Sequence, residues 1–407
     1  MTKKKQKAAS PRQADRSVSK PAKTGRTAKP RSRETSALAP RAKKIRYAVV
    51  GLGYISQIAV LPAFKHAENS ELVALISLDP VKRERLAKKY GVEHTADYDG
   101  FEDCLRQADV DAVYIGLPNS MHHKFAVRAA RLGVHVLCEK PMATSVDECR
   151  EMIEVARNND VKLMIAYRLH FEEANLEAIR IVKNRQIGEP RLFTSVFSAP
   201  VKDRGNIRLS EELGGGPMMD LGIYAINAAR YLFGAEPTEV SAIAASAGGD
   251  ERFREVDEMV SAVLKFPGDR LAVLTSSFGA ADASYFEVMG TRGKLRVEPA
   301  YDFAKGLTHH LTIGEKTKTR HFAKRDQFAP ELVYFSDCIR LDRPVEPSGH
   351  AGLADVQIIL ALQESANLGR AVSLEVPQPE LQPGPSQEIR RPALARAPKL
   401  VHAAPPA

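Results

Sequence analysis

The sequence of 407 residues lacks features that membrane, secreted and metal-binding proteins need. No stretch approaches the ~18 consecutive apolar residues of a membrane-spanning helix, and the lysine-rich start has no apolar run to form the core of a signal peptide. The four cysteines form no CxxC pair, which argues against structural disulfides and a cysteine zinc site. The histidine pairs at 122–123 and 309–310 have no supporting cluster of carboxylates or cysteines. We therefore expect a cytoplasmic protein with reduced thiols and no metal.

Acidic and aromatic residues are scarce at the start of the chain. Residues 1–44 have nine Lys and six Arg against Asp15 and Glu34, a net charge of +13 in a chain whose total is +9. This leader cannot bury enough apolar surface to offset the entropy of ordering, so we expect it to be disordered. It is a solvated tail, a weak contact for nucleic acid, or an arm over a partner subunit. The Pro-rich stretch 377–407 is likewise expected not to fold.

Between these ends the chain is long and apolar enough for two domains. In 45–168, short β-branched runs alternate with amphipathic helical stretches, which is the pattern of a parallel sheet built from βαβ units. Ser145 followed by Glu148 is typical of a helix start. The predicted fold class is α/β, with a doubly wound Rossmann sheet in this part. The predicted strands cover 45–50, 72–76, 112–115, 134–137 and 163–166, and the helices cover 80–90, 121–132 and 145–158.

The first predicted strand is followed by a variant of the GxGxxG motif in which Ser56 takes the third place. Gly51 permits a tight turn, and Gly53 lets the backbone approach a pyrophosphate. The helix that starts here directs free N–H groups and a positive dipole at the phosphates. The motif therefore predicts a dinucleotide site that includes Tyr54 and Ile55 of the same loop. Glycines of an ordinary turn are the alternative.

The end of the second strand predicts which dinucleotide binds, because an acidic side chain usually accepts hydrogen bonds from the ribose of NAD there. This position is Ser77, which carries no repelling charge, and Lys82 and Arg83 could neutralise a 2′-phosphate. The pattern favours NADP. NAD stays possible if Lys82 and Arg83 form only a solvated face and Asp79 reaches the ribose.

A lysine follows the fifth predicted strand, at the edge of the sheet where ligands bind in such folds. This is Lys140, between Glu139 and Pro141. It could hold both the cofactor ribose and the substrate oxygen, and we expect burial beside a cationic ring to lower its pKa toward proton transfer.

At Glu139-Lys140-Pro141 the chain resembles the glucose-fructose oxidoreductase, inositol dehydrogenase and rhizopine-catabolism (Gfo/Idh/MocA) superfamily, and it looks closest to the glucose-fructose oxidoreductase branch. The resemblance runs from about 45 to 374. It implies that 169–376 form an α+β domain with an open, mainly antiparallel sheet, which binds substrate and packs against another subunit as a homodimer or homotetramer. The other stretches that carry the resemblance are Leu117-Pro118-Asn119-Ser120, Tyr167-Arg168-Leu169-His170 and 214–224, which contains Asp220 and Tyr224.

The resemblance assigns Lys140 as the catalytic lysine, Asp220 as the contact of a substrate hydroxyl and Tyr224 as the acid/base. Asp220 and Tyr224 are four residues apart, so on a helix both point into one cleft. A tyrosine near a cationic lysine has its phenolate favoured, which suits proton exchange with an alkoxide. Further predicted contacts are Arg168, His170 and Arg208 for the substrate, and Leu117, Pro118, Asn119, His122 and Glu139 for the cofactor, with Asn119 and His122 at the nicotinamide.

The sequence thus predicts an NADP-preferring oxidoreductase that moves a hydride between the nicotinamide and a sugar or polyol. A nicotinamide-binding sensor or scaffold without turnover is one alternative. A protein that contacts nucleic acid through the basic leader is another.

Overall fold

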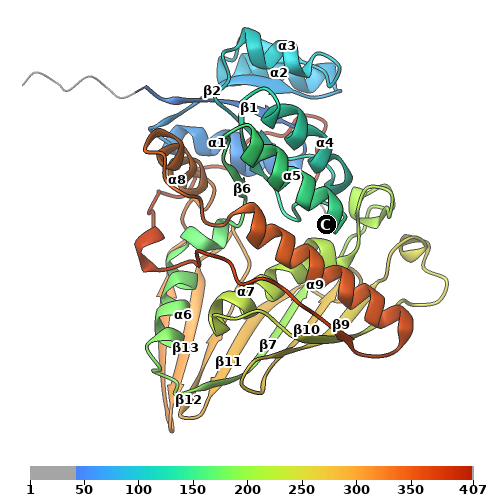
Figure 1. The fold of residues 1–407 in the computed structure, drawn as a ribbon, viewed down its shortest axis with the longest axis vertical. Helices are drawn as coiled ribbons and strands as arrows, with labels where there is room; N and C mark the ends of the chain where they lie inside the picture. Colours follow the sequence, from blue (N-terminus) through green and yellow to red (C-terminus); the bar gives the residue numbers. More distant parts are fainter. Residues whose placement is uncertain (1–42, 406–407) are drawn as a thin grey trace, which may run out of the picture. The chain divides into compact units, whose positions relative to one another are not determined.

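The computed structural model describes residues 43–405 (Figure 1). The first 42 residues and the last two lie outside the described residues, and with them nearly all of the predicted leader 1–44. Within 43–405, no helix is both long and apolar enough to cross a membrane.

The first domain is built on a six-stranded parallel sheet in the order β3-β2-β1-β4-β5-β6. Its strands form because short β-branched runs are buried on both faces, as in β4, where all four residues are buried. The strand order reverses between β1 and β4, which opens a crevice at their carboxyl ends. The Rossmann prediction is confirmed. The strands are β1 (Ile45–Val50), β2 (Ser70–Ile76), β3 (His94–Ala96), β4 (Ala112–Ile115), β5 (His135–Cys138) and β6 (Leu163–Ile165).

Helices cover both faces of this sheet. Leu61, Leu86 and Phe335 belong to one apolar cluster, and Phe125 and Met152 belong to the other. The predicted capping box is present at the start of α5, where Ser145 accepts from the Glu148 backbone N–H. The helices are α1 (Leu61–Ala63), flanked by a π-helical turn (Ser56–Val60) and a 3₁₀ turn (Phe64–His66), then α2 (Pro80–Tyr90), α3 (Phe101–Gln107), α4 (Asn119–Ala130) and α5 (Val146–Asn158).

The second domain contains a nine-stranded sheet in the order β14-β13-β12-β11-β7-β10-β9-β8-β15. Every neighbouring pair is antiparallel except β7 and β10, so the predicted open, mainly antiparallel sheet is confirmed. The strands are β7 (Pro190–Ser198), β8 (Glu239–Ala245), β9 (Met259–Phe266), β10 (Arg270–Ser277), β11 (Ala283–Gly290), β12 (Gly293–Val297), β13 (Leu307–Ile313), β14 (Lys316–Phe322) and β15 (Val372–Ser373).

One face of this sheet packs against helices that lie between it and the first domain (Figure 1). Helix α9 runs across β8 and also contacts α5 and β6, while α8 packs on β1 and β2. Helices α8 and α9 therefore return to the first domain. The helices of this part are α6 (Glu173–Lys183), α7 (Ile223–Phe233), α8 (Ala329–Arg340) and α9 (Gly349–Leu368).

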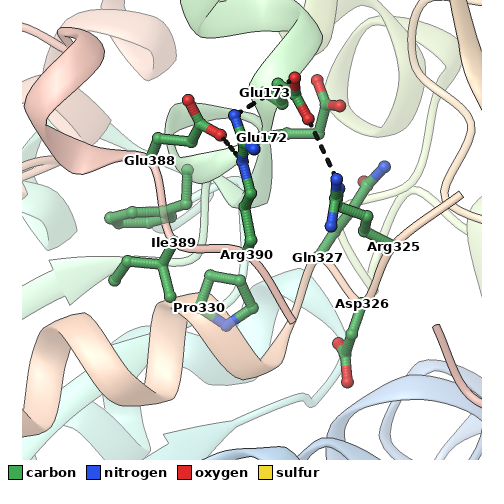
Figure 2. A pocket seen from close by; sticks show the side chains of 10 residues that line it. Glu172, Glu173, Arg325, Asp326, Gln327, Pro330, Glu388, Ile389 and Arg390 are labelled. Carbon is green, nitrogen blue, oxygen red and sulfur yellow. Dashed lines mark hydrogen bonds and ion pairs between the residues drawn. The ribbon is translucent and has the colours of Figure 1, made fainter. Parts of the chain in front are cut away.

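The C-terminal stretch corrects the sequence prediction for residues 377–405, which are placed against the body of the protein. Gln387 is buried and donates to Glu346, and Arg391 donates to the backbone oxygen of His66 over 2.9 Å. Figure 2 shows the pocket beneath this stretch, where Arg390 reaches Glu173. The stretch needs no core of its own, because side chains of the folded domains satisfy its polar groups.

Candidate functional site

Three side chains from distant parts of the sequence meet at the carboxyl edge of the first sheet. Lys140 follows β5, while Asp220 lies in a π-helical turn (Met218–Gly222) that leads into α7 with Tyr224. The Lys140 Nζ donates to the Asp220 backbone oxygen over 2.7 Å and to its Oδ1 over 3.1 Å. The same Nζ lies 4.6 Å from the centre of the Tyr224 ring. The structure therefore brings the predicted lysine, aspartate and tyrosine into one cluster.

Asp220 is the centre of this cluster. Its second oxygen, Oδ2, accepts from the Arg208 Nε over 2.6 Å. Burial opposes ionisation of this carboxyl, but the charges of Arg208 and Lys140 outweigh it and hold the pKa of Asp220 well below its usual range. Asp220 is thus a permanent carboxylate that positions two cations.

The pKa of Lys140 corrects the sequence prediction. Burial lowers it, but the Asp220 carboxylate beside the ammonium, with smaller contributions from its other neighbours, outweighs burial, and the net shift is upward. The expectation of a lowered pKa counted burial and a cationic ring beside the lysine, and it omitted the carboxylate that the fold brings to the ammonium. Lys140 therefore stays charged and serves as an electrostatic group and a hydrogen-bond donor.

Two cations lie close to Tyr224. The Arg168 guanidinium lies 5.2 Å from its ring centre, and the Arg168 Nη2 donates to the Tyr224 hydroxyl over 3.4 Å. Arg168 is itself buried and donates to the backbone oxygen of Tyr301 and to the side chain of Gln327. The Tyr224 hydroxyl consequently lies near positive charge, and its hydrogen bond from Arg168 orients it.

The glycine-rich loop fits a dinucleotide. Gly51 has φ +89°, and a Cβ there would lie 2.4 Å from the Gly116 oxygen, so only glycine is accommodated. A Cβ on Gly53 would meet nothing within 4 Å, which leaves open space beside the backbone where a pyrophosphate is expected. Ser56 is buried and donates to the Gly51 oxygen over 2.6 Å, which closes the turn.

Two neighbouring residues of the loop, Tyr54 and Ile55, lie in different environments. The pKa of Arg208 is raised chiefly by Asp220, with smaller contributions from the hydroxyls of Tyr224 and Tyr54. Tyr54 therefore lies close enough to Arg208 for an electrostatic interaction between the two side chains. Ile55 is half-buried and packs on the apolar cluster around α1 and α2.

The end of β2 has the predicted serine. Ser77 is buried, and its Oγ accepts from the Asp79 N–H over 3.4 Å. The Asp79 Oδ1 caps α2 by accepting from the backbone N–H groups of Val81 and Lys82. Arg83 donates to the Ser77 and Leu78 backbone oxygens, which holds its positive charge at this strand end. One oxygen of Asp79 is therefore committed to the helix cap.

Three of the predicted cofactor contacts, Leu117, Pro118 and Asn119, lie at the start of α4. The Asn119 Nδ2 donates to the Gly214 oxygen over 2.7 Å and ties α4 to the glycine run before α7. Pro118 is the first residue before α4, and Leu117 is buried. Asn119 therefore ties the start of α4 to the second domain.

His122 does not lie as predicted at the nicotinamide pocket. It is fully buried, with Nδ1 2.8 Å from the Pro141 oxygen and Nε2 3.0 Å from the Leu117 oxygen. Burial lowers its pKa, so the neutral ring donates to one of these oxygens. The ring joins the loops after β4 and β5 because both loops end at the same sheet edge.

His170 is also corrected as a substrate contact. It is buried, with Nδ1 2.8 Å from Glu346 and Nε2 2.7 Å from the Asn227 Oδ1. Both ring nitrogens are used inside the protein. Arg168, at the start of the same 3₁₀ turn (Arg168–Phe171), donates to Tyr224 of the cluster.

Two buried glutamates, Glu139 and Glu331, influence each other's charge. The sequence analysis singled out only Glu139. Burial raises the pKa of Glu139, which accepts from the Tyr114 hydroxyl over 2.5 Å. Glu331 of α8 was not identified from the sequence. Its pKa is raised well above the usual value by burial and by Glu139, and neither carboxyl oxygen has a partner among the described residues. A glutamate within the apolar run 329–333 was the signal that could have revealed it.

The described residues contain no cluster of three or more metal-ligating side chains. What the geometry supplies instead is a phenol, an ammonium, a carboxylate and two guanidinium groups beside a dinucleotide loop. Such a set can exchange a proton and stabilise negative charge on an oxygen.

Family models match most of the folded chain. Residues 45–167 match the model described as an oxidoreductase family with an NAD-binding Rossmann fold. Residues 175–296 match the GFO/IDH/MocA C-terminal domain.

Two curated proteins and two solved structures illustrate the similarity. D-xylose 1-dehydrogenase (NADP(+)) of Haloarcula marismortui is 36% identical over 81% of this chain and 93% of that protein. D-xylose 1-dehydrogenase (NADP(+)) 2 of Haloferax volcanii is 31% identical over 81% of this chain and 99% of that protein. The aldose-aldose oxidoreductase of Caulobacter crescentus, solved with glycerol, has a TM-score of 0.79 and 36% identity over 82% of this chain and all of that chain. A 3-ketoreductase of Actinomadura kijaniata, solved with NADP and TDP-benzene, has a TM-score of 0.73 and 26% identity over 79% of this chain and 98% of that chain.

Proposed function

Because the chain belongs to the GFO/IDH/MocA oxidoreductase family, we propose that it is an NADP-preferring enzyme that transfers a hydride between the nicotinamide and a sugar or polyol. The observation that carries the proposal is the meeting of Lys140, Asp220 and Tyr224 beside the glycine-rich loop. The names of the relatives support the substrate class and the cofactor, since they include NADP-dependent xylose dehydrogenases and an aldose-aldose oxidoreductase.

The chain's own residues divide the acid-base work. In oxidation of an alcohol, the Tyr224 oxygen takes the hydroxyl proton while the carbon loses a hydride; in reduction of a carbonyl it returns the proton. The charges of Lys140 and Arg168 stabilise the phenolate that carries this exchange. Asp220 holds Lys140 and Arg208 in place and accepts a hydrogen bond from a second substrate hydroxyl. The nicotinamide, when bound, accepts or supplies the hydride.

The cofactor-binding residues follow from the fit of the loop. Gly51, Gly53 and the helix start at Ser56 would hold the pyrophosphate, and Ser77 with Lys82 and Arg83 would hold the phosphorylated ribose. Glu139 and Asn119 border the crevice at its nicotinamide end.

The outer face of the second sheet is the surface through which we propose that the subunits associate as a homodimer or homotetramer. Among the described residues no helix covers this face, and burial alternates along β9, with Val263 exposed between buried neighbours. Val263 pairs with Val273, and Ile243 and Leu271 are exposed on the adjoining strands. An apolar strip of this kind is typical of a protein interface.

The activity test measures reduced nicotinamide by absorbance when the protein is given NADP or NAD and a panel of aldoses, ketoses and polyols. We expect turnover with at least one sugar and NADP. We expect Lys140→Ala and Tyr224→Phe to slow it by about 100-fold while NADP binding survives, because acid-base groups typically contribute at least ~10².

Tyr98→Phe is the matched control, since Tyr98 lies outside the cluster and its ring packs against Phe125. Turnover that Tyr224→Phe leaves intact would contradict the acid-base assignment. NADP binding without turnover on any sugar would favour a sensor over an enzyme.

A further inference from the structure

The last described part of the C-terminal stretch is bonded to the dinucleotide loop through one side chain. The Gln57 Oε1 accepts from the Val401 N–H over 2.8 Å, and the Gln57 Nε2 donates to the Val401 oxygen over 2.8 Å. The same Nε2 donates to the oxygen of Leu52, within the glycine-rich loop, over 2.9 Å. Gln57 is buried, so these bonds are shielded from water. The loop that faces the pyrophosphate is therefore linked to the end of the chain.

Val401 also makes apolar contact. It packs on the cluster that contains Val60 and Leu61 beside the glycine-rich loop and Leu86 of α2. Its position is consequently set by both packing and hydrogen bonds, although it is 344 residues from Gln57 in sequence. This anchoring determines where the next residue, His402, lies.

His402 lies at the end of β2 that reads the cofactor ribose. Its Nδ1 is 2.9 Å from the Asp79 Oδ2. The hydrogen bond from His402 is the first cause that lowers the pKa of Asp79, so the carboxylate is ionised and Nδ1 is the donor. The other oxygen of Asp79 caps α2. With His402 in place, both oxygens of Asp79 are occupied.

An unoccupied Asp79 oxygen would change which cofactor this end of the site favours. A carboxylate at the end of the second strand accepts hydrogen bonds from the ribose hydroxyls of NAD. The same charge repels a 2′-phosphate. Ser77 alone therefore does not make this strand end suitable for NADP, because Asp79 lies two residues farther on.

We propose that His402 is a specificity-determining residue of the cofactor site: held by Val401 on Gln57, it occupies Asp79 Oδ2 and makes the site select NADP over NAD. This rests on the proposed NADP preference. The C-terminal stretch is thus part of the cofactor site, as well as a cover of the first domain.

The test is a double-mutant cycle with affinities for NADP and NAD measured by titration calorimetry on the full chain. We expect His402→Ala to lower the affinity for NADP by about tenfold, the scale of one charge-assisted hydrogen bond. The affinity for NAD should stay equal or rise. In an Asp79→Asn background, where asparagine still caps α2, His402→Ala should change the ratio of the two affinities less than twofold.

The control is Arg396→Ala, which removes an exposed cation of the same stretch. It should leave both affinities unchanged, and all variants should melt within a few degrees of wild type. The inference would be overturned if His402→Ala lowered the affinities for NADP and NAD equally. It would also be overturned if the loss of NADP affinity persisted in the Asp79→Asn background. A wild-type protein that prefers NAD would instead refute the proposed cofactor preference, whatever the variants do.

Discussion

At the scale of single residues, charge decides what each side chain of the site can do. Lys140 resembles a base in the sequence, but the Asp220 carboxylate raises its pKa, so it acts as a positive charge. In the proposed mechanism Tyr224 is the group that exchanges a proton, and both Lys140 and Arg168 lie within about 6 Å of its ring centre. The residue types were predictable, whereas the sign of the Lys140 shift depends on a residue 80 positions away.

Glu331 gives a prediction about stability and pH. Its pKa in the folded protein is raised well above the usual value, so the folded chain retains a proton that the unfolded chain has lost. The contribution of Glu331 to stability is therefore fully present below the ordinary glutamate pKa of ~4.3 and is lost as the pH rises toward the folded pKa. We expect Glu331→Gln to remove this titration, so that its melting temperature falls less than that of wild type between acidic and alkaline pH.

Melting curves across that pH range check this prediction, with Glu84→Gln on the exposed face of α2 as the control. If wild type and Glu331→Gln lose stability in parallel, the buried carboxyl is not the source of the pH dependence.

At the scale of elements, a buried ion network joins α7 to α9. Arg230 donates to Glu236 and, over 2.6 Å, to Asp355 of α9. Removing the cation leaves two buried carboxylates uncompensated. We expect Arg230→Ala to lower the free energy of unfolding by about 3–5 kcal/mol, whereas Arg254→Ala, in an exposed pair with Glu251, should cost less than ~1 kcal/mol.

Urea unfolding of the two variants measures this difference. Similar losses for the buried and the exposed arginine would contradict the network's role in holding the helices together.

The elements that sequence reasoning missed are short or polar. The strands β3 and β15 have three and two residues, too few for a periodic pattern. The edge strand β14 has six exposed residues of seven, so its sequence lacks apolar alternation and only pairing with β13 makes it a strand. Local sequence also does not reveal the π-helical turn before α7, which contains Asp220, the residue that accepts from Lys140.

At the scale of the whole molecule, the outer sheet face predicts association. We expect Val263→Lys to place a charge in the apolar strip and to reduce the mass in solution to that of a smaller assembly or a monomer. Light scattering coupled to size-exclusion chromatography measures this. Leu341→Lys, at an exposed position beyond α8, is the control. An unchanged assembly would mean that subunits meet elsewhere.

The sequence by itself determined the local features of this protein: the strand, glycine turn and helix that suit a dinucleotide, the capping box of α5, and the Lys140, Asp220 and Tyr224 set. The glycine turn and the capping box are encoded within a few neighbouring residues, where spacing and side-chain chemistry suffice, whereas the choice of Lys140, Asp220 and Tyr224 followed from the family resemblance. Tertiary structure alone decided that Lys140 is a charge, that His122 and His170 are internal ties, and that the chain's end reaches Asp79. Burial and electrostatic environment come from segments far apart in sequence, and no local pattern records them.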